Sequence, residues 1–296
     1  MSHSVISLGL GLGGGKSATS SGAPGGGGFA YDLDDSYGIS VVPNLHLDAS
    51  ILDGADASNN PSNGASVATW GDRSGNGNDF AEASNQPLFR SSLLRGKAGV
   101  EFDGSNDILS DADFFTSEAS AGRSFSADAT MVVVGIPGRD GSGGFGLGTS
   151  DSSYQFVKTS GVTNSADVHA AADYSANFLS ARIAGVAPDS PYRLMSTTRP
   201  FINGCKIDAS DYKVFTNKRQ RYGVSMSGLT FSVAAGASLG GVGTYNPLAG
   251  YILEVLIFNT VIEDSDWDTI HTYLSAKYGL NVYAAPSTST YALDGT

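Results

Sequence analysis

The strongest hydrophobic pattern in the chain runs from residue 250 to residue 280, GYILEVLIFNTVIEDSDWDTIHTYLSAKYGL. Its first part, residues 251–258, is aliphatic or aromatic at every position except Glu254. A strand that is apolar on both faces must be covered on both faces. The pattern therefore predicts a central buried strand at 251–258.

An amphipathic helix is expected directly after this strand. Residues 264–266, Asp-Ser-Asp, supply the cap-forming and acidic side chains that suit a helix N-terminus. Lys277 lies where the last turn would be, and Gly279 supplies the left-handed position that ends a helix. The apolar residues at helical spacing are Trp267, Ile270, Tyr273, Leu274 and Tyr278. This stripe predicts a helix that packs on the central strand.

Short strands with Gly- and Asn-rich turns are expected upstream, at intervals of about ten residues. They are expected at 45–47, 67–70, 99–102, 108–109, 131–134, 154–158, 182–186, 192–197, 229–234 and 238–241. Hairpin turns are expected at 103–107 and at Asn203-Gly204, because Gly and Asn accept a positive φ. The pattern predicts an all-β, antiparallel β-sandwich with one C-terminal helix packed on it.

Four motifs also resemble a known family. The C-terminal segment is similar to the end of LamG-like (concanavalin A-like lectin) jelly-roll domains, where a strand of the type AEVLIYN leads into a helix ending YLAAKWGL. LHLDAS (45–50), WGDRSGNGNDF (70–80) and GVEFDGSNDIL (99–109) resemble the opening of the same family, in the same order. The resemblance implies a jelly roll of the kind found in virion proteins of tailed bacteriophages. It leaves the function open, because this architecture carries binding, structural and catalytic roles.

The expected organisation is a Gly/Ser-rich N-terminal arm at 1–28, a lead-in segment at 29–42, the jelly-roll domain at 43–280 and a C-terminal extension at 281–296. The arm is expected either to be a flexible coil or to dock as a strand on another subunit. Its docking residues would be Val5, Ile6, Leu8, Leu10 and Leu12. Glycines 9, 11 and 14 match a dinucleotide-binding spacing, but neither the strand nor the helix that such a site needs surrounds them.

Composition excludes several classes. The net charge of −12 over 296 residues argues against a nucleic-acid partner, and no apolar run is long enough to span a membrane. The N-terminus lacks the positive region of a signal peptide, so assembly in a host cytoplasm is expected. The single cysteine, Cys205, excludes an intramolecular disulfide and is expected to be a packing residue.

Catalytic patterns are sparse. Jelly-roll glucanases carry their carboxylates on one strand as E-x-D-x-x-E, whereas the strand at 251–258 carries Glu254 alone, expected to meet a backbone or Arg partner. The histidines at 3, 46, 169 and 271 have no metal-ligand spacing, and His271 is expected on the solvated side of the helix. No G-x-S-x-G nucleophile elbow occurs. The expectation is that the chain is not an enzyme and has no cofactor.

Three sets of residues are candidate binding sites. In the turn at 72–78, Asp72, Asn76 and Asn78 could hold Ca²⁺ or a sugar, or could simply satisfy their own backbone. Four basic residues lie close together in this acidic chain: Lys213, Lys218, Arg219 and Arg221. This basic cluster could contact an acidic neighbour or could be a solvated hairpin tip. Aromatic faces could stack on sugar rings at Tyr154, Tyr174, Phe178, Tyr192 and Tyr245.

The function expected from these features is that of a non-enzymatic structural protein of a phage virion, as a head decoration, fibre or tail appendage. Its partners would be other virion proteins, copies of itself in a homo-oligomer such as a trimer, and host-surface glycans. The alternative is a carbohydrate-binding module or a glycan-degrading enzyme with the concanavalin-like fold. No nucleic acid and no membrane are expected as partners.

Overall fold

The computed structural model describes residues 30–34, 37–125, 128–137, 171–173, 178–180, 200–208, 210–225, 236–240 and 248–280. Every strand pairing within these residues is antiparallel. The arm at 1–28, the extension at 281–296 and the strands expected at 154–158, 182–186, 192–197 and 229–234 lie outside them. None of the described helices is long and apolar enough to cross a membrane.

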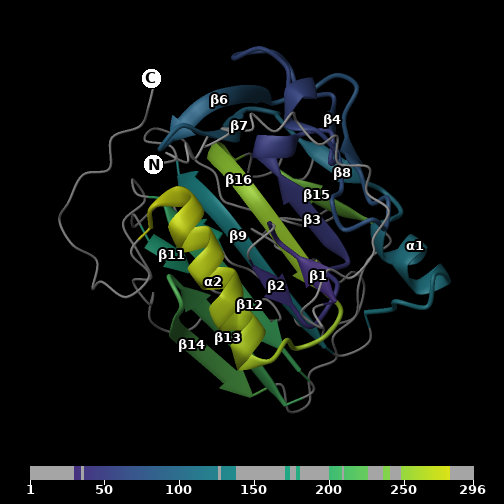
Figure 1. Ribbon diagram of the computed structural model, residues 1–296, viewed down its shortest axis with the longest axis vertical. Helices are drawn as coiled ribbons and strands as arrows, with labels where there is room; N and C mark the ends of the chain where they lie inside the picture. Colours follow the sequence, from purple (N-terminus) through teal and green to yellow (C-terminus); the bar gives the residue numbers. More distant parts are fainter. Residues whose placement is uncertain are drawn as a thin grey trace, which may run out of the picture.

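A large sheet of eight strands forms one layer of a sandwich (Figure 1). Its strand order is β14-β13-β12-β9-β16-β7-β6, and β3 also pairs with β16, beside β7. The strands are β3 (Leu45–Asp48), β6 (Leu88–Leu94), β7 (Lys97–Asp103), β9 (Ala129–Pro137), β12 (Phe201–Ile207), β13 (Asp211–Thr216), β14 (Arg219–Ser225) and β16 (Ala249–Phe258). The strand expected at 251–258 is therefore confirmed as the centre of the sheet.

A second sheet of four strands forms the other layer, in the order β15-β8-β5-β4. These strands are β4 (Thr69–Trp70), β5 (Phe80–Ala81), β8 (Leu109–Asp111) and β15 (Ala237–Leu239). The main apolar core lies between the two sheets and contains Trp70 and Phe80 from the small sheet and Val255 and Ile257 from β16. The predicted antiparallel β-sandwich is confirmed.

Short elements complete the described fold. Two small hairpins pair β1 (Tyr31–Asp32) with β2 (Gly38–Ile39) and β10 (Ala171–Asp173) with β11 (Phe178–Ser180). The helical turns η1 (Ala49–Ile51) and η2 (Ala57–Asn59) follow β3, and the helix α1 (Phe114–Ser120) follows β8. Phe114 and Phe115 attach α1 to the main core through ring contacts with each other and with Phe125.

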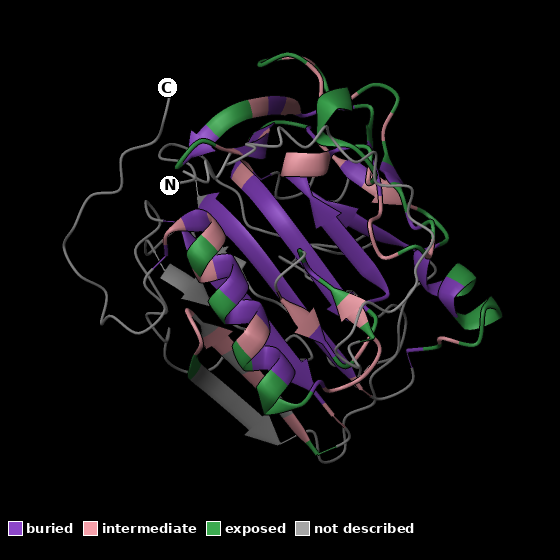
Figure 2. Ribbon diagram, in the orientation of Figure 1, coloured by how far each residue is buried: buried purple, intermediate pink, exposed green. Residues whose placement is uncertain are grey.

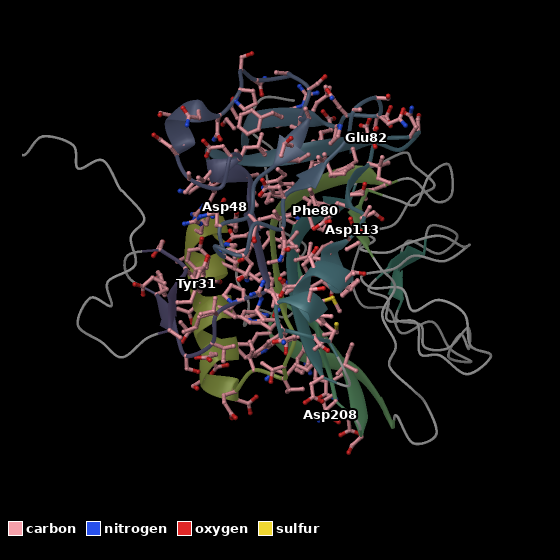
Figure 3. All side chains as sticks on the ribbon, turned by 90° about the vertical axis from the view of Figure 1, so that its right-hand side faces the viewer. Tyr31, Asp48, Phe80, Glu82, Asp113 and Asp208 are labelled. Atoms are coloured by element: carbon pink, nitrogen blue, oxygen red, sulfur yellow. The ribbon has the colours of Figure 1, made fainter. Side chains whose placement is uncertain are left out.

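The C-terminal helix α2 (Asp264–Tyr278) covers the outer face of the large sheet and creates a second core. The five residues of the expected stripe are all buried, and Gly279 ends the helix with φ +66°. Figure 2 shows α2 buried along one side and exposed along the other, with β16 buried almost throughout. Figure 3 shows Tyr31 on the α2 side of the large sheet and Phe80 on the side of the small sheet. Both faces of β16 are therefore covered, as predicted.

A bulge in β16 sets which side chains reach the helix. The register with β9 shifts between Ile252 and Glu254, so that Leu253 is an extra residue. Ile252 packs in the main core, whereas Leu253 packs in the core under α2 and Glu254 bonds to the hydroxyl of Tyr278. Because a bulge breaks the strict alternation of a strand, two successive residues can face α2.

The two predicted hairpin turns are wrong. Residues 103–107 connect β7 of the large sheet to β8 of the small sheet, so the flanking strands do not pair. Asn203 and Gly204 lie inside β12, which pairs with β9 and β13 along its length. The hairpin turn is at Asn217 and Lys218, whose φ values are +47° and +68°. Gly204 is needed for close packing, because a Cβ there would lie 2.7 Å from Trp267 Cη2.

His271 is buried, contrary to the expectation of a solvated residue. It lies four residues after Trp267, so both side chains share one face of α2. The ring centroids of these two residues lie 4.4 Å apart, and Phe215 of β13 packs on Trp267 at 4.6 Å. Cys205 is also buried and packs in the main core, as expected; burial raises the pKa of its thiol to about 12.

Candidate functional site

A buried cluster of charged residues lies between α2 and the large sheet. In β3, His46 and Asp48 alternate with Leu45 and Leu47, which face the main core. The register places Asp48 opposite Glu254 of β16. All three polar residues are at most 2% exposed. The alternation of β3 therefore points an imidazole and a carboxylate toward the helix, beside the carboxylate that the bulge brings there.

Lys277 closes this cluster from the last turn of α2. Its Nζ donates to Glu254 Oε2 at 2.6 Å, to Asp48 Oδ2 at 2.7 Å and to the hydroxyl of Tyr273 at 2.9 Å. An ammonium group has three N–H donors, so these bonds use all of them. The expectation of an Arg or backbone partner for Glu254 is wrong: its partners are Lys277, His46 and Tyr278.

Charge pairing keeps the cluster ionised despite its burial. Burial alone would raise the pKa of Glu254, but the ammonium of Lys277 and the hydrogen bond from His46 hold it far below its usual range. Burial alone would lower the pKa of Lys277, but Glu254 and Asp48 raise it above its ordinary value. Buried charges that lack such partners would be neutral or strongly destabilising.

Tyr31 and Arg73 extend the cluster outward. His46 Nε2 lies 2.8 Å from Glu254 Oε1, and His46 Nδ1 lies 2.8 Å from the Tyr31 hydroxyl. Because a carboxylate can only accept, His46 donates to Glu254 through Nε2. The Tyr31 hydroxyl also donates to the Arg73 carbonyl at 3.1 Å. Arg73 Nη1 donates to Asp48 Oδ2 at 2.9 Å. The positions of these groups are therefore fixed before any ligand arrives.

His46, Asp48 and Glu254 also form a possible metal-ligand set, since their ligand atoms lie within 4.8 Å of one another. However, Lys277 Nζ bonds to both carboxylates, in the position that a cation would need. The donor set fits an internal ion cluster in which the lysine supplies the positive charge.

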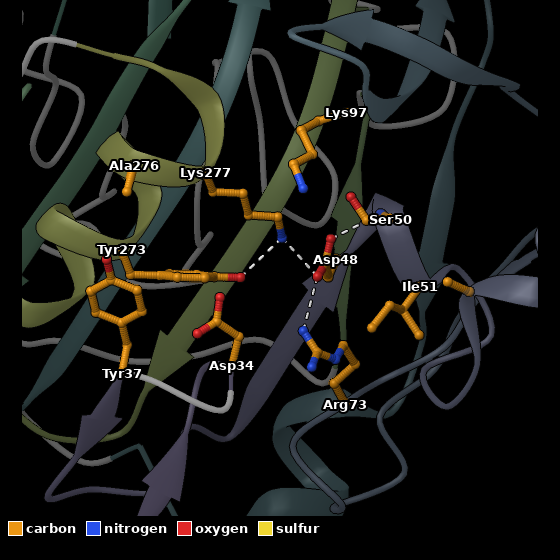
Figure 4. A pocket seen from close by; sticks show the side chains of 11 residues that line it. Asp34, Tyr37, Asp48, Ser50, Ile51, Arg73, Lys97, Tyr273, Ala276 and Lys277 are labelled. Carbon is orange, nitrogen blue, oxygen red and sulfur yellow. Dashed lines mark hydrogen bonds and ion pairs between the residues drawn. The ribbon is translucent and has the colours of Figure 1, made fainter. Parts of the chain in front are cut away.

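A cavity of about 340 Å³ opens beside the cluster, between the end of α2, the start of η1 and the loop after β1 (Figure 4). Pockets that bind small molecules measure about 300–1,000 Å³, so this one has room for a single small ring. Its apolar lining includes Ile51 and Ala276, and its charged and aromatic lining consists of Asp34, Tyr37, Asp48, Arg73, Lys97, Tyr273 and Lys277. The rings of Tyr37 and Tyr273 have centroids 5.5 Å apart.

The turn at 72–78 is bound tightly to the start of β3. Asp72 accepts hydrogen bonds from the backbone of His46, Ser74 and Asn78 and from the Ser74 hydroxyl. Asn76 and Asn78 both direct their side-chain NH₂ groups to the Asn44 carbonyl. These contacts are those of a turn that satisfies its own backbone, the alternative weighed for this motif.

Asn78 and Asn44 also hold α1. Each donates through its side-chain amide to the buried carboxylate of Glu118, which Arg123 neutralises. Asn44 Oδ1 in turn accepts from the backbone of Asn259, just after β16. The family-like motif at 70–80 therefore connects α1, β3 and the end of β16.

The other candidate residues are dispersed. Lys213 pairs with Asp211 at 3.2 Å, Lys218 pairs with Asp268 of α2 at 2.8 Å, and Arg219 is exposed. The side chains of Arg221 and Phe178 are not described. Residues outside the described ranges are the arm residues Val5, Ile6, Leu8, Leu10 and Leu12 and the aromatic residues Tyr154, Tyr174, Tyr192 and Tyr245. Their expected roles in assembly and glycan contact stay predictions.

The cluster beside Lys277 was missed from the sequence. Its members lie far apart in the sequence; His46 and Glu254 alone are 208 positions apart. One signal was present: in LHLD, His46 and Asp48 occupy alternate positions, so both must face the same side of a strand. Two weaker signals were Glu254 on the buried strand and Lys277 on the covering helix.

No protein-family model matches this sequence, and no curated protein matches it. Solved structures are similar in fold. A sialidase from Trypanosoma rangeli has a TM-score of 0.52 at 15% identity, over 84% of this chain and 35% of that one. A GH54 α-L-arabinofuranosidase has a TM-score of 0.51 at 13% identity, over 76% of this chain and 54% of that one. The chain thus spans about a third of the first protein and about half of the second.

A third similar structure is the binding domain of Paraclostridial Mosquitocidal Protein 1. Its TM-score is 0.48 at 12% identity, over 72% of this chain and 51% of that one. The first two similarities show a shared β-sandwich fold. They contradict the expectation of a non-enzymatic chain, because the proteins with this fold include a sialidase and an arabinofuranosidase, which are enzymes. The particular LamG-like resemblance remains a resemblance.

Proposed function

We propose that this chain is a sugar-binding β-sandwich and that the cavity beside Lys277 is its binding site. The observation that carries the proposal is the cavity itself, in which charged groups fixed by a buried ion cluster converge beside two tyrosine rings. A few fixed polar groups set in a partly aromatic pocket are the usual composition of a small-molecule site. Support for a sugar as the ligand comes from the fold, which two sugar-acting enzymes share.

An array of immobilised glycans tests this proposal with the full chain. The wild-type protein is expected to bind a defined subset of glycans. Replacement Tyr37→Ala removes part of the aromatic wall and is expected to lower that signal. The matched control is Val42→Ala, which truncates an exposed apolar residue that does not line the cavity. Binding that Tyr37→Ala leaves intact would place the sugar elsewhere.

Glycoside cleavage is the second candidate function, favoured by the enzymes among the structural neighbours. Glycosidases typically use a pair of carboxylates, and Asp34 and Asp48 are the two carboxylates that line the cavity. Fluorogenic sialosides and arabinofuranosides test this candidate directly. Fluorophore release above the buffer rate, lost in Asp48→Asn, would support cleavage; release equal to the buffer rate would remove the candidate.

The setting that we propose is the virion of a tailed bacteriophage, with the sandwich contacting host-surface glycans and the segment 1–28 anchoring it. Support comes from the four family-like motifs, which occur in the order expected for such domains. Sedimentation of the isolated protein is expected to show a homo-oligomer, and deletion of 1–28 is expected to abolish incorporation into particles. Incorporation of the truncated protein would disprove the anchoring role.

A further inference from the structure

Lys97 brings to the cavity a positive charge that no hydrogen bond or ion pair among the described residues holds, although the carboxylates of Asp34 and Asp48 line the same cavity. It is the first residue of β7, and its side chain points into the cavity toward Lys277 (Figure 4). Within the described residues it has no hydrogen-bond or ion-pair partner. The charge of Lys277, in contrast, is balanced by Glu254 and Asp48. Two ammonium groups that face one space repel each other, and an anion between them relieves that repulsion.

On the same side of the cavity, two further side chains have hydrogen-bond donors that lack an acceptor among the described residues. The Ser50 hydroxyl lines the cavity and is buried without a partner. Arg73 uses Nη1 on Asp48, and a guanidinium offers five N–H donors in total. An unsatisfied buried hydroxyl is unfavourable, so a ligand that accepts a hydrogen bond from it removes that cost.

The two carboxylates of the lining, Asp34 and Asp48, bond neither to the Lys97 ammonium nor to the Ser50 hydroxyl. Asp48 Oδ2 accepts from both Arg73 and Lys277, and Asp48 Oδ1 accepts from the backbone of Ser50. A ligand group that only accepts hydrogen bonds and is negatively charged would supply the missing partner of Lys97 and of the Ser50 hydroxyl. A carboxylate fits, because its two oxygens match the fork of an arginine and accept from a lysine at the same time.

The rest of the cavity suits the ring that bears this carboxylate. Tyr37, Ile51 and Ala276 provide a largely apolar surface, and the volume limits the ligand to about one ring. With a net charge of −12, the chain as a whole repels anions at long range. Recognition of an anion here must come from contacts inside the cavity.

We infer that the sugar bound in this cavity carries a carboxylate, which Lys97, Arg73 and Ser50 hold while the ring lies against Tyr37. This inference rests on the proposed function. It assigns a class of ligand, uronic or sialic acids, to a site on the helix-covered face of the large sheet.

Titration calorimetry on the full chain tests the inference. The acidic probes are D-glucuronic acid, D-galacturonic acid and N-acetylneuraminic acid; the neutral probes are D-glucose, D-galactose and D-glucuronamide. At least one acidic probe is expected to bind at least about tenfold more tightly than every neutral probe, as charge-assisted hydrogen bonds imply. Lys97→Gln is expected to abolish this preference, Lys97→Arg to retain it, and Lys213→Gln, which lies outside the cavity, to leave it unchanged.

The outcomes separate the two proposals. Equal binding of acidic and neutral sugars, with loss of both in Tyr37→Ala, would overturn the carboxylate inference and leave the sugar-binding function standing. A preference for acidic sugars that survives Lys97→Gln in a correctly folded protein would also overturn the inference. If none of the six sugars binds but the array signal is present and is lost in Tyr37→Ala, the inference fails and the sugar-binding function stands; if neither experiment shows binding, both fail.

Discussion

The ammonium of Lys277, in the last turn of α2, lies 2.6 Å from the carboxylate of Glu254 in the centre of β16. The same ammonium reaches Asp48 of β3 at 2.7 Å. One side chain thus binds the covering helix to two neighbouring strands of the large sheet and forms the inner wall of the cavity. This contact therefore both attaches α2 to the large sheet and fixes the shape of the proposed binding site.

Replacement Lys277→Met is expected to destabilise the protein by about 3–5 kcal/mol, because it leaves two buried carboxylates without their cation. Urea denaturation measures the change. The control is Lys218→Met, which breaks the pair with the largely exposed Asp268 and is expected to cost less than about 1 kcal/mol. Equal losses in the two variants would show that the cluster contributes no more than a surface ion pair.

Gly204→Ala is expected to destabilise the protein by about 1–3 kcal/mol through overpacking against Trp267 and the Met131 carbonyl. Trp267→Phe removes the part of the ring that includes Cη2 and should relieve some of the clash. The double variant is therefore expected to be more stable than the sum of the two single changes predicts, measured as the midpoint of thermal unfolding in a double-mutant cycle. Simple additivity would contradict this contact.

Acid is expected to destabilise the protein through His271. Burial lowers the pKa of this histidine to about 4 from an ordinary value near 6.5. As pH falls, the unfolded chain takes up a proton at this histidine before the folded chain does. The contribution of neutral His271 to the free energy of unfolding is therefore complete above about pH 6.5 and is lost as pH falls toward 4. The loss amounts to about 3 kcal/mol, at about 1.4 kcal/mol per unit of pKa.

Denaturation midpoints of the wild type and of His271→Gln across pH 4–7 isolate this effect. The variant cannot titrate at this position, so the difference in stability between the two proteins is expected to shrink steadily as pH falls. A difference that stays constant over this interval would show that His271 does not remain neutral in the fold.

Asp107→Asn is expected to stabilise the protein at pH 7. Burial, together with the nearby Asp103 and Glu101, raises the pKa of the Asp107 carboxyl to about 6. The protonated Asp107 carboxyl therefore makes its full contribution to folding stability below about pH 3.8, and this contribution is lost as pH rises through 6. The amide keeps an oxygen to accept from the Asp103 backbone without the charge.

The gain is expected to be about 1–2 kcal/mol at neutral pH, after allowance for the solvent that reaches this turn. It should vanish below about pH 4, where the carboxyl is protonated in both the folded and the unfolded chain. Thermal unfolding at pH 7 and pH 3.5 measures both values. An equal gain at the two pH values would exclude this electrostatic origin.

Local patterns predicted the parts of the fold that depend on near neighbours in sequence. The apolar run at 251–258 and the stripe from Trp267 to Tyr278 each carry their own period, and both became the elements expected. The hairpin turn predicted at Asn203-Gly204 is wrong because strand pairing on both sides and contact with Trp267 override the local preference for a turn. Local turn preference is weak evidence where tertiary packing decides.

The candidate site could not be predicted in the same way. Its charges come from β3, β16, the turn at 72–78 and α2, and only the strand register brings Asp48 beside Glu254. A lysine in the last turn of a helix is favoured by the helix dipole alone. The position of Lys277 in the sequence therefore does not reveal that it also pairs with buried carboxylates. Lys97 carried no distinguishing pattern at all.

The most direct test of the central claim is a crystal structure of the full chain soaked with the sugar that binds most tightly in calorimetry. The account predicts a single sugar ring in the cavity between α2 and β3, with its carboxylate within hydrogen-bonding distance of Lys97 and Arg73 and its ring against Tyr37. A sugar bound at the loops of the sandwich or on the small sheet, with this cavity containing only water, would contradict it.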